Sequence, residues 1–218
     1  MKNLLNPDGF LFQALTRVGD LIILNVLFII TCIPIVTIGA AQAALYKVVM
    51  DMHYEQEAGM FKGFFRAFKQ NFKQATIVWV VELIVLVSLV CDWLLVMSYF
   101  DVTVMYVLLG VLAALVVCVC AYMIPLLVRY QNSLRQHLSN AMILAVIKLP
   151  KTILMVVLTW LPLIIFALSA SMGNTVFWDT FVFWLAIGFA FIAYMNMFLM
   201  KPIYTQLEGG KNKVSLFM

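Results

Sequence analysis

The sequence predicts an all-α fold, a polytopic transmembrane helical bundle of five or six helices that is built from hairpins and carries amphipathic cytoplasmic helices. Composition is the first reason: the chain is 65% hydrophobic and 11% charged, with a mean hydropathy of +1.05. A soluble domain carries roughly 25% charged residues. The second reason is that two long blocks, 74–128 and 152–200, contain no lysine or arginine.

Each of these blocks is long enough for a hairpin, because one crossing needs ~20 apolar residues. The basic residues lie between and around the blocks, and loops rich in Lys and Arg stay on the cytoplasmic side of a membrane. We therefore expect extracytoplasmic hairpin tips and a cytoplasmic C-terminus. The basic balance is explained by helix ends, and the chain lacks the basic-aromatic stripe of a nucleic-acid interface.

The first element, 10–52, is predicted to be a broken helix pair. Pro34 disfavours helical geometry at the residue before it, and Thr37 can cap a second helix. We expect Pro34, Thr37 and Gly39 to mark a helix break at which the chain turns back, which gives six helices. A single crossing would instead give five and place the N-terminus outside.

The next element, 53–75, is predicted to be an amphipathic cytoplasmic segment. Its aromatic side chains alternate with lysine and arginine at helical spacing, as in a helix that lies in the headgroup region or against a partner protein. We call these residues the phenylalanine face, a candidate partner-binding face: Phe61, Phe64, Phe65, Phe68 and Phe72.

The rest of the chain repeats this plan within a single membrane domain, 1–218. We expect a hairpin, a second cytoplasmic segment, another hairpin and a cytoplasmic tail, over 76–128, 129–151, 152–200 and 201–218.

Glu82 is the polar residue that most needs an explanation. It lies ~10 Å into its predicted span, and an ionised acid at a helix centre costs about 2.5 kcal/mol or more. It can serve as a proton or solute site, or it can tie helices together by hydrogen bonds. The candidate intramembrane polar site therefore comprises Glu82, Asn25, Asn196 and Tyr194.

No enzyme motif is present, since the chain lacks a P-loop, a Gly-x-Ser-x-Gly elbow and a His-Glu-x-x-His helix. Its four cysteines fall within apolar segments, and we interpret them as packing residues. Cys118 and Cys120 lie roughly 200° apart around a helix, so they cannot share a metal ion. We expect no catalytic, cofactor or metal site.

Three stretches of the sequence, 20–25, 34–46 and 65–75, resemble the YesL-like family of small bacterial membrane proteins. The resemblance covers essentially the whole chain through its spacing and length. It implies a bacterial cytoplasmic membrane and no settled activity, so no catalytic residue is carried over. Relatives tend to be encoded beside ABC-type carbohydrate importers.

Two functions follow as hypotheses. The first is a non-enzymatic accessory to ABC-type carbohydrate uptake, which acts from the lipid bilayer on transporter subunits or a membrane sensor and can form a homo-oligomer. The alternative is a small-solute transporter in its own right that uses Glu82.

Overall fold

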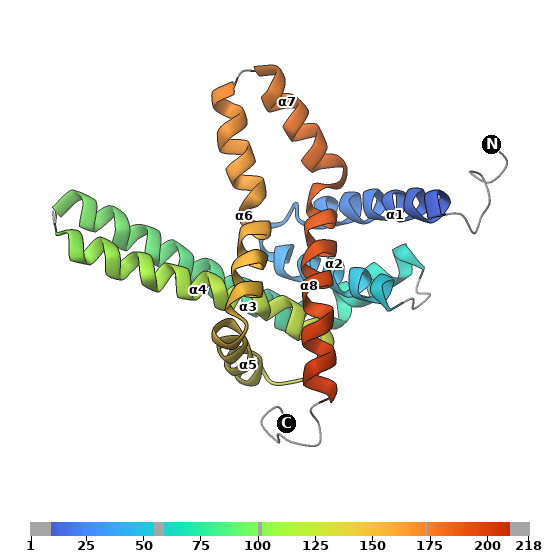
Figure 1. Ribbon diagram of the computed structural model, residues 1–218, viewed down its shortest axis with the longest axis horizontal. Helices are drawn as coiled ribbons and strands as arrows, with labels where there is room; N and C mark the ends of the chain where they lie inside the picture. Colours follow the sequence, from blue (N-terminus) through green and yellow to red (C-terminus); the bar gives the residue numbers. More distant parts are fainter. Residues whose placement is uncertain (1–9, 55–58, 100–101, 173, 210–218) are drawn as a thin grey trace.

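The computed structural model describes residues 10–54, 59–99, 102–172 and 174–209, and this part of the chain contains helices and no strand. Six of its helical stretches are long and apolar enough to cross a membrane, so the predicted polytopic helical bundle is confirmed. The helices shown in Figure 1 are α1 (Phe10–Thr31), α2 (Ile38–His53), α3 (Met60–Tyr99), α4 (Thr103–Arg129), α5 (Leu134–Ile147), α6 (Leu149–Met172), α7 (Asn174–Phe183) and α8 (Phe189–Gly209).

The chain turns back near Pro34, as the six-helix prediction requires. α1 ends at Thr31, a short 3-10 turn follows at Ile35–Thr37, and α2 then runs antiparallel to α1. The Thr37 hydroxyl does not cap α2. It donates instead to two carbonyl oxygens that precede it in the chain, those of Thr31 at 2.6 Å and Pro34 at 2.7 Å, so it stabilises the turn between α1 and α2.

Gly39 belongs to the packing of α2 and not to the break. A Cβ at this position would overlap the Ala75 carbonyl oxygen and lie 2.5 Å from the Trp79 Cβ on α3. Four fully buried alanines extend this small-residue surface along α2, which contacts α1, α3, α4 and α8: Ala40, Ala41, Ala43 and Ala44. Small residues let helix backbones approach closely in a membrane. α2 is therefore the centre of the bundle.

α3 is one continuous helix from Met60 to Tyr99, so the structure has no boundary at 75 between the amphipathic segment and the hairpin. Its length is ~60 Å at 1.5 Å per residue, about twice the ~30 Å thickness of a hydrocarbon core. The amphipathic part therefore extends the transmembrane part as a single rod.

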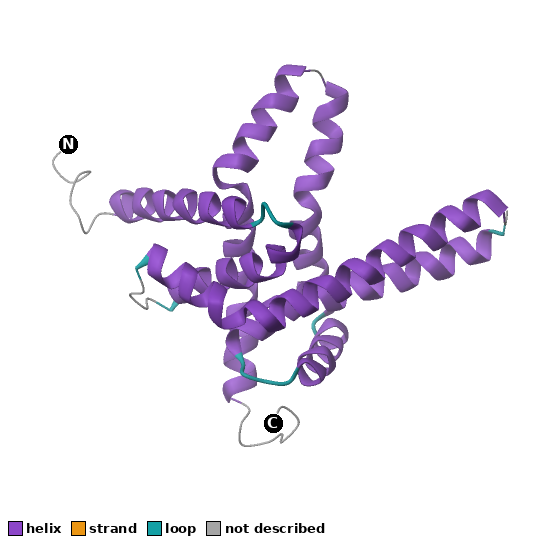
Figure 2. Ribbon diagram, turned by 180° about the vertical axis from the view of Figure 1, so that it is seen from behind, coloured by secondary structure: helices purple, strands orange, loops and turns teal. Residues whose placement is uncertain are grey.

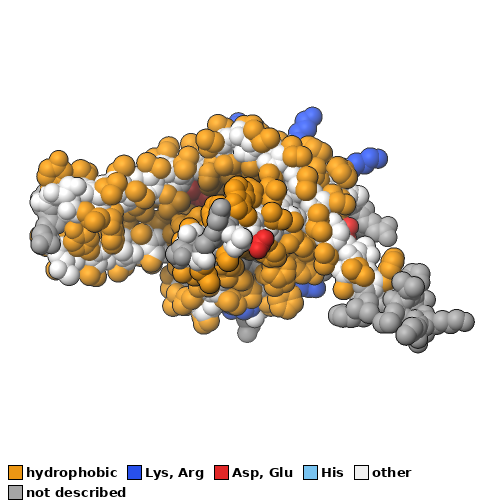
Figure 3. Space-filling model, turned by 90° about the horizontal axis from the view of Figure 1, so that it is seen from above, with side chains coloured by type: hydrophobic (Ala, Val, Ile, Leu, Met, Phe, Trp, Pro, Cys, Tyr) orange, Lys and Arg blue, Asp and Glu red, His pale blue; other side chains and the backbone are white. Residues whose placement is uncertain are grey.

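The α3–α4 and α6–α7 hairpins project from the centre in different directions (Figure 1, Figure 2). Hydrophobic side chains cover the projecting α3–α4 arm, and lysine and arginine gather at the opposite end and along one edge (Figure 3). Leu94 and Leu108, for example, are 56% and 64% exposed. Such surfaces are stable in lipid, where water is absent.

A π-helical segment, Trp184–Gly188, connects α7 to α8. α6 ends at Met172 and α7 already begins at Asn174, so the connection between these two helices is short. At its other end α8 continues to Gly209, so the first part of the expected tail 201–218 is helical, and residues 210–218 lie outside the described part.

The helix ends that the sequence places on the basic side meet at one end of the bundle. Arg17 of α1 donates to the Met52 carbonyl oxygen at 3.0 Å, which joins the start of α1 to the end of α2. Arg129 forms a bidentate ion pair with Glu208, with N–O distances of 2.7 and 3.0 Å. Lys201 donates to the His53 carbonyl oxygen at 3.2 Å. An even number of membrane crossings explains this arrangement, because it returns these helix ends to the same side.

Candidate functional site

The polar residues proposed from the sequence occupy three separate places. Asn25 lies against the π-helical segment, Tyr194 stacks on the His53 ring with centroids 4.2 Å apart, and Glu82 lies on α3. Asn196 donates hydrogen bonds to Tyr46 and Thr159, two side chains that line a cavity beside Glu82. The prediction that all four form a single site is therefore wrong for Asn25 and Tyr194.

Asn25 binds the backbone of another hairpin. It is fully buried; its Nδ2 donates to the carbonyl oxygens of Trp184 at 3.1 Å and Leu185 at 2.8 Å, and its Oδ1 accepts from the Ala190 amide at 3.0 Å. A π-helical turn disrupts the ordinary i→i−4 ladder and leaves such groups available. Asn25 is therefore a structural tie between α1 and the α7–α8 junction.

Glu82 lines a cavity of about 170 Å³ bounded by α2, α3, α4 and α6. Helical spacing explains its position, because Ala75, Trp79, Glu82 and Leu86 share one face of α3. Ala75 packs on α2, and the three residues beyond it form a wall of the cavity. Glu82 lies ~13 Å along the helix from Lys73 and ~26 Å from Tyr99, which places it in the half of the span nearer the basic end.

Polar and aromatic side chains from the other helices complete the cavity. α2 contributes Gln42 and Tyr46, one helical turn apart, and α6 contributes Thr159 and Trp160. Asn196 of α8 lies behind this wall, where its Nδ2 donates to the Tyr46 hydroxyl and to Thr159 Oγ1, each at 3.0 Å. The α1–α2 helix pair (through α2), the α3–α4 hairpin, and the third hairpin (through α6 and α8) therefore all contribute to the site.

α4 supplies Cys120, Ala121 and Pro125 to the same cavity. The thiol of Cys120 lies against the Glu82 carboxylate. Proline lacks an N–H, so Pro125 cannot donate to the carbonyl of Ala121 four residues earlier. Cys120 was interpreted as a packing residue, and its place on the cavity wall corrects that interpretation.

Hydrogen bonds fix the walls but leave acceptors available. Trp79 Nε1 donates to the Ile35 carbonyl oxygen at 3.0 Å, and the Thr159 hydroxyl donates to that of Met155 at 2.8 Å. In contrast, Glu82 Oε1 and Asn196 Oδ1 are buried without a hydrogen-bond partner among the described residues. These two oxygens are acceptors that a bound solute can satisfy, and the Gln42 amide and Trp160 N–H on the cavity wall are donors without a partner among the described residues.

The sequence pointed to Glu82 and Asn196 but missed Gln42, Tyr46, Trp79, Thr159 and Trp160. The i, i+4 spacing of Gln42 with Tyr46 was a visible signal, and so was the proline within α4. Within the described residues, no group of three or more His, Cys, Asp or Glu side chains is placed to hold a metal ion.

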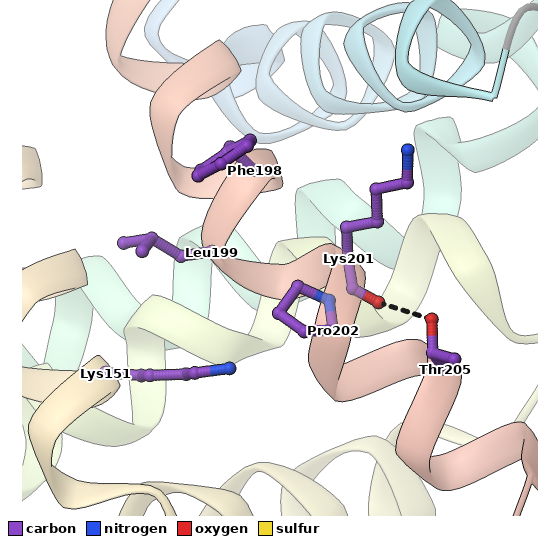
Figure 4. Close-up of a pocket in the computed structure, with 6 residues that line it drawn as sticks. All are labelled: Lys151, Phe198, Leu199, Lys201, Pro202 and Thr205. Carbon is purple, nitrogen blue, oxygen red and sulfur yellow. Dashed lines mark hydrogen bonds between the residues drawn. The ribbon is translucent and has the colours of Figure 1, made fainter.

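A second concavity, of about 530 Å³, lies between α6 and α8 near the basic end (Figure 4). Phe198, Leu199 and Pro202 form much of its wall. The Lys201 ammonium points away from Lys151, toward the end of α2, where it donates to the His53 carbonyl (Figure 4). With its cations diverging and its walls mostly apolar, this groove is an apolar depression in the surface.

The phenylalanine face is divided by the structure. Phe64 is fully buried and Phe68 is half-buried, whereas Phe61, Phe65 and Phe72 are 58%, 51% and 39% exposed. Part of this face therefore packs within the protein, and the exposed part lies beside Lys62, Arg66 and Lys69.

Residues 21–93 match the model of a family described as "Protein of unknown function, DUF624". The match runs from α1 through α2 into α3, and it includes the turn at Pro34, Gly39 and Glu82. It contains most of the stretches that resemble the YesL-like family, and its description assigns no activity. No curated protein matches the chain, and no solved structure does.

Proposed function

We propose that this chain is a non-enzymatic, multi-pass protein of the bacterial cell membrane that moves a small solute through the Glu82 cavity. The observation that carries the proposal is that all three hairpins meet around this one acidic side chain. An ionisable residue inside a membrane bundle marks a solute or ion path by default. A relative movement of the hairpins would change which side of the membrane the cavity faces, as in other helical transporters.

The orientation is part of the proposal. The ends of α1, α2, α4 and α8 that carry Arg17, His53, Arg129 and Lys201 would face the cytoplasm, because short loops rich in Lys and Arg stay there. The tips of the α3–α4 and α6–α7 hairpins would then be outside, and the C-terminus would be cytoplasmic.

The size of the cavity favours direct transport of a small solute over passage of a sugar. Its volume is about 170 Å³. A cavity of ~150 Å³ accommodates a molecule of the size of benzene. An oligosaccharide does not fit, so a role in carbohydrate uptake would have to operate through another surface.

Thiol accessibility tests the transport proposal without a known solute. In a variant that keeps only Cys120, a membrane-impermeant methanethiosulfonate reagent should react in both right-side-out and inside-out vesicles. Gln42→Cys in a cysteine-free background repeats the measurement from the α2 wall. Lys62→Cys is the control, which should react only from the cytoplasmic side.

Reaction of both cavity positions from one side alone would contradict transport and leave a one-sided binding site. Reaction at neither position, with a reactive Lys62→Cys control, would show that no solute reaches Glu82. Either result removes the transport proposal.

The second candidate function is the accessory role in ABC-type carbohydrate uptake, and the exposed part of the phenylalanine face favours it. Large aromatic side chains beside cations are typical anchors for a partner helix. Phe61 and Phe65 are exposed on α3, although the Phe65 ring also packs edge-on against the buried Phe64 ring, with centroids 5.7 Å apart.

The double variant Phe61→Ala/Phe65→Ala should therefore insert normally but lose copurifying subunits of an ABC importer and lower uptake of that importer's sugar. Ile84→Ala/Val87→Ala is the matched control, since these exposed side chains lie on the same helix away from the basic segment. Unchanged uptake and copurification in the first variant would remove the accessory role for that importer.

A further inference from the structure

We infer that the Glu82 cavity takes a small organic ammonium ion, such as a methylated or primary amine in its charged form. This inference rests on the proposed function, because it names the class of solute for the same cavity. Charge is the first reason. Among the described residues, Glu82 is the one ionisable acid or base on the cavity wall besides the thiol of Cys120 and the phenol of Tyr46, and none of the lining residues is a lysine, an arginine or a histidine. An anion would find no cation there.

Hydrogen bonding is the second reason. Two side-chain acceptors at the site lack a partner among the described residues: Glu82 Oε1 and, behind the wall, Asn196 Oδ1. In addition, Pro125 cannot donate to the Ala121 carbonyl as an ordinary helical residue would. The donors of Trp79, Thr159 and the Asn196 amide are already used within the protein, whereas the Gln42 amide, the Trp160 indole N–H and the Tyr46 hydroxyl hydrogen have no acceptor among the described residues. A solute that carries positive charge and also accepts a hydrogen bond, as choline does through its hydroxyl group, matches this set.

The aromatic walls are the third reason. Trp79 of α3, Trp160 of α6 and Tyr46 of α2 all line the cavity. The face of an aromatic ring attracts an ammonium group, with tryptophan the strongest, and aromatic cages are the usual sites for methylated ammonium ions. Tryptophan anchored by its N–H, as Trp79 is to Ile35, holds its ring in a fixed orientation.

Size sets the upper limit. A volume of about 170 Å³ suits a compact ion such as tetramethylammonium or choline, by comparison with the ~150 Å³ that holds benzene. The same ion would neutralise a carboxylate whose burial in the membrane is otherwise costly.

Protection of the cavity thiol tests this inference. In the Cys120-only protein, choline should slow the reaction with a neutral thiol reagent, whereas 3,3-dimethylbutan-1-ol, which has the same shape without the charge, should protect at least ~10-fold less well. Glu82→Gln keeps the size of the side chain and should abolish the advantage of choline. Asp92→Asn makes the same change at an exposed carboxylate on α3 and should leave it intact.

Trp160→Leu gives a second, independent readout. Loss of one cation–π contact should weaken protection by choline about 2- to 30-fold and leave protection by the neutral alcohol nearly unchanged. Gln42→Cys serves as the reporter if the Cys120 thiol reacts too slowly.

The inference is overturned if the neutral alcohol protects as well as choline, if Glu82→Gln retains the preference, or if only sodium, potassium or protons change the reaction rate. These results are distinct from a failure of the proposed function. That failure appears as a thiol that reacts from one side only or from neither.

Discussion

Asn25→Ala should be among the most destabilising substitutions in the bundle. The Asn25 side chain makes three hydrogen bonds to the backbone at Trp184, Leu185 and Ala190, over distances of 2.8 to 3.1 Å. It is fully buried, and alanine would leave two carbonyl oxygens and one amide without these partners. The α7–α8 junction would lose its connection to α1.

The expected loss follows from the number of bonds. Hydrogen bonds between helices in a membrane protein average ~0.6 kcal/mol and reach ~1.7 kcal/mol. Three of them give about 2 kcal/mol, with an upper limit near 5 kcal/mol. Asn25→Asp should cost at least as much, because it keeps the acceptor toward Ala190 but directs a second oxygen at two carbonyl oxygens.

Reversible unfolding in mixed micelles, with a rising fraction of dodecyl sulfate and circular dichroism as the readout, measures this change in the free energy of unfolding. Ser88→Ala is the control, since the exposed Ser88 hydroxyl bonds only the Val85 carbonyl in its own helix. It should stay within ~0.5 kcal/mol of the unmodified protein. An Asn25→Ala protein that also stays within this range would refute the structural tie.

Three further predictions concern packing, protonation and orientation. Gly39→Ala should cost about 1 to 3 kcal/mol in the same unfolding assay, because the new Cβ overlaps the Ala75 carbonyl oxygen; an unchanged midpoint would contradict the close α2–α3 contact. Burial lowers the pKa of His137, so the unfolded chain binds more protons than the folded one, and the free energy of unfolding should fall as the pH drops below ~6.5. His137→Leu should make this dependence on pH less steep. An equally steep dependence in the variant would argue against the burial of His137 as the cause. Tyr99→Cys should react with an impermeant reagent from outside and Lys62→Cys only from the cytoplasmic side, and the reverse pattern would overturn the proposed orientation.

The hairpins and the turn at Pro34 were predictable because their signals are local. A block without lysine or arginine indicates where the membrane-spanning helices lie, and Pro34 indicates a helix break, although Pro125, Pro162 and Pro202 lie within helices. The continuity of α3 was not predictable in this way. Its composition changes at Lys73, from amphipathic to apolar, but both parts have helical spacing. The structure shows a single helix through both, with Ala67, Ala75 and Val78 buried on either side of the change.

The partners of buried polar residues were harder to predict. Membrane burial implies that Asn25 must find hydrogen bonds, but it does not indicate with what. In the sequence, polar side chains such as Glu82 were the evident candidates for the partner of Asn25. The partner is the backbone of a π-helical turn, and a deviation of one residue from the α-helical ladder leaves no clear mark in a sequence of alanine, leucine and aromatic residues.

The hydrogen bonds of the three intramembrane residues distinguish the structural roles of Asn25 and Asn196 from the role that we propose for Glu82. Asn25 and Asn196 each bind two or more groups on other helices, as residues that tie a bundle together should. Glu82 faces the thiol of Cys120, which is a weak donor, and its Oε1 has no partner among the described residues. A carboxylate is the most costly of these groups to bury, and here it has the weakest protein contacts. Stability alone would favour an apolar residue or a glutamine at this position, which is consistent with the proposal that Glu82 binds a solute.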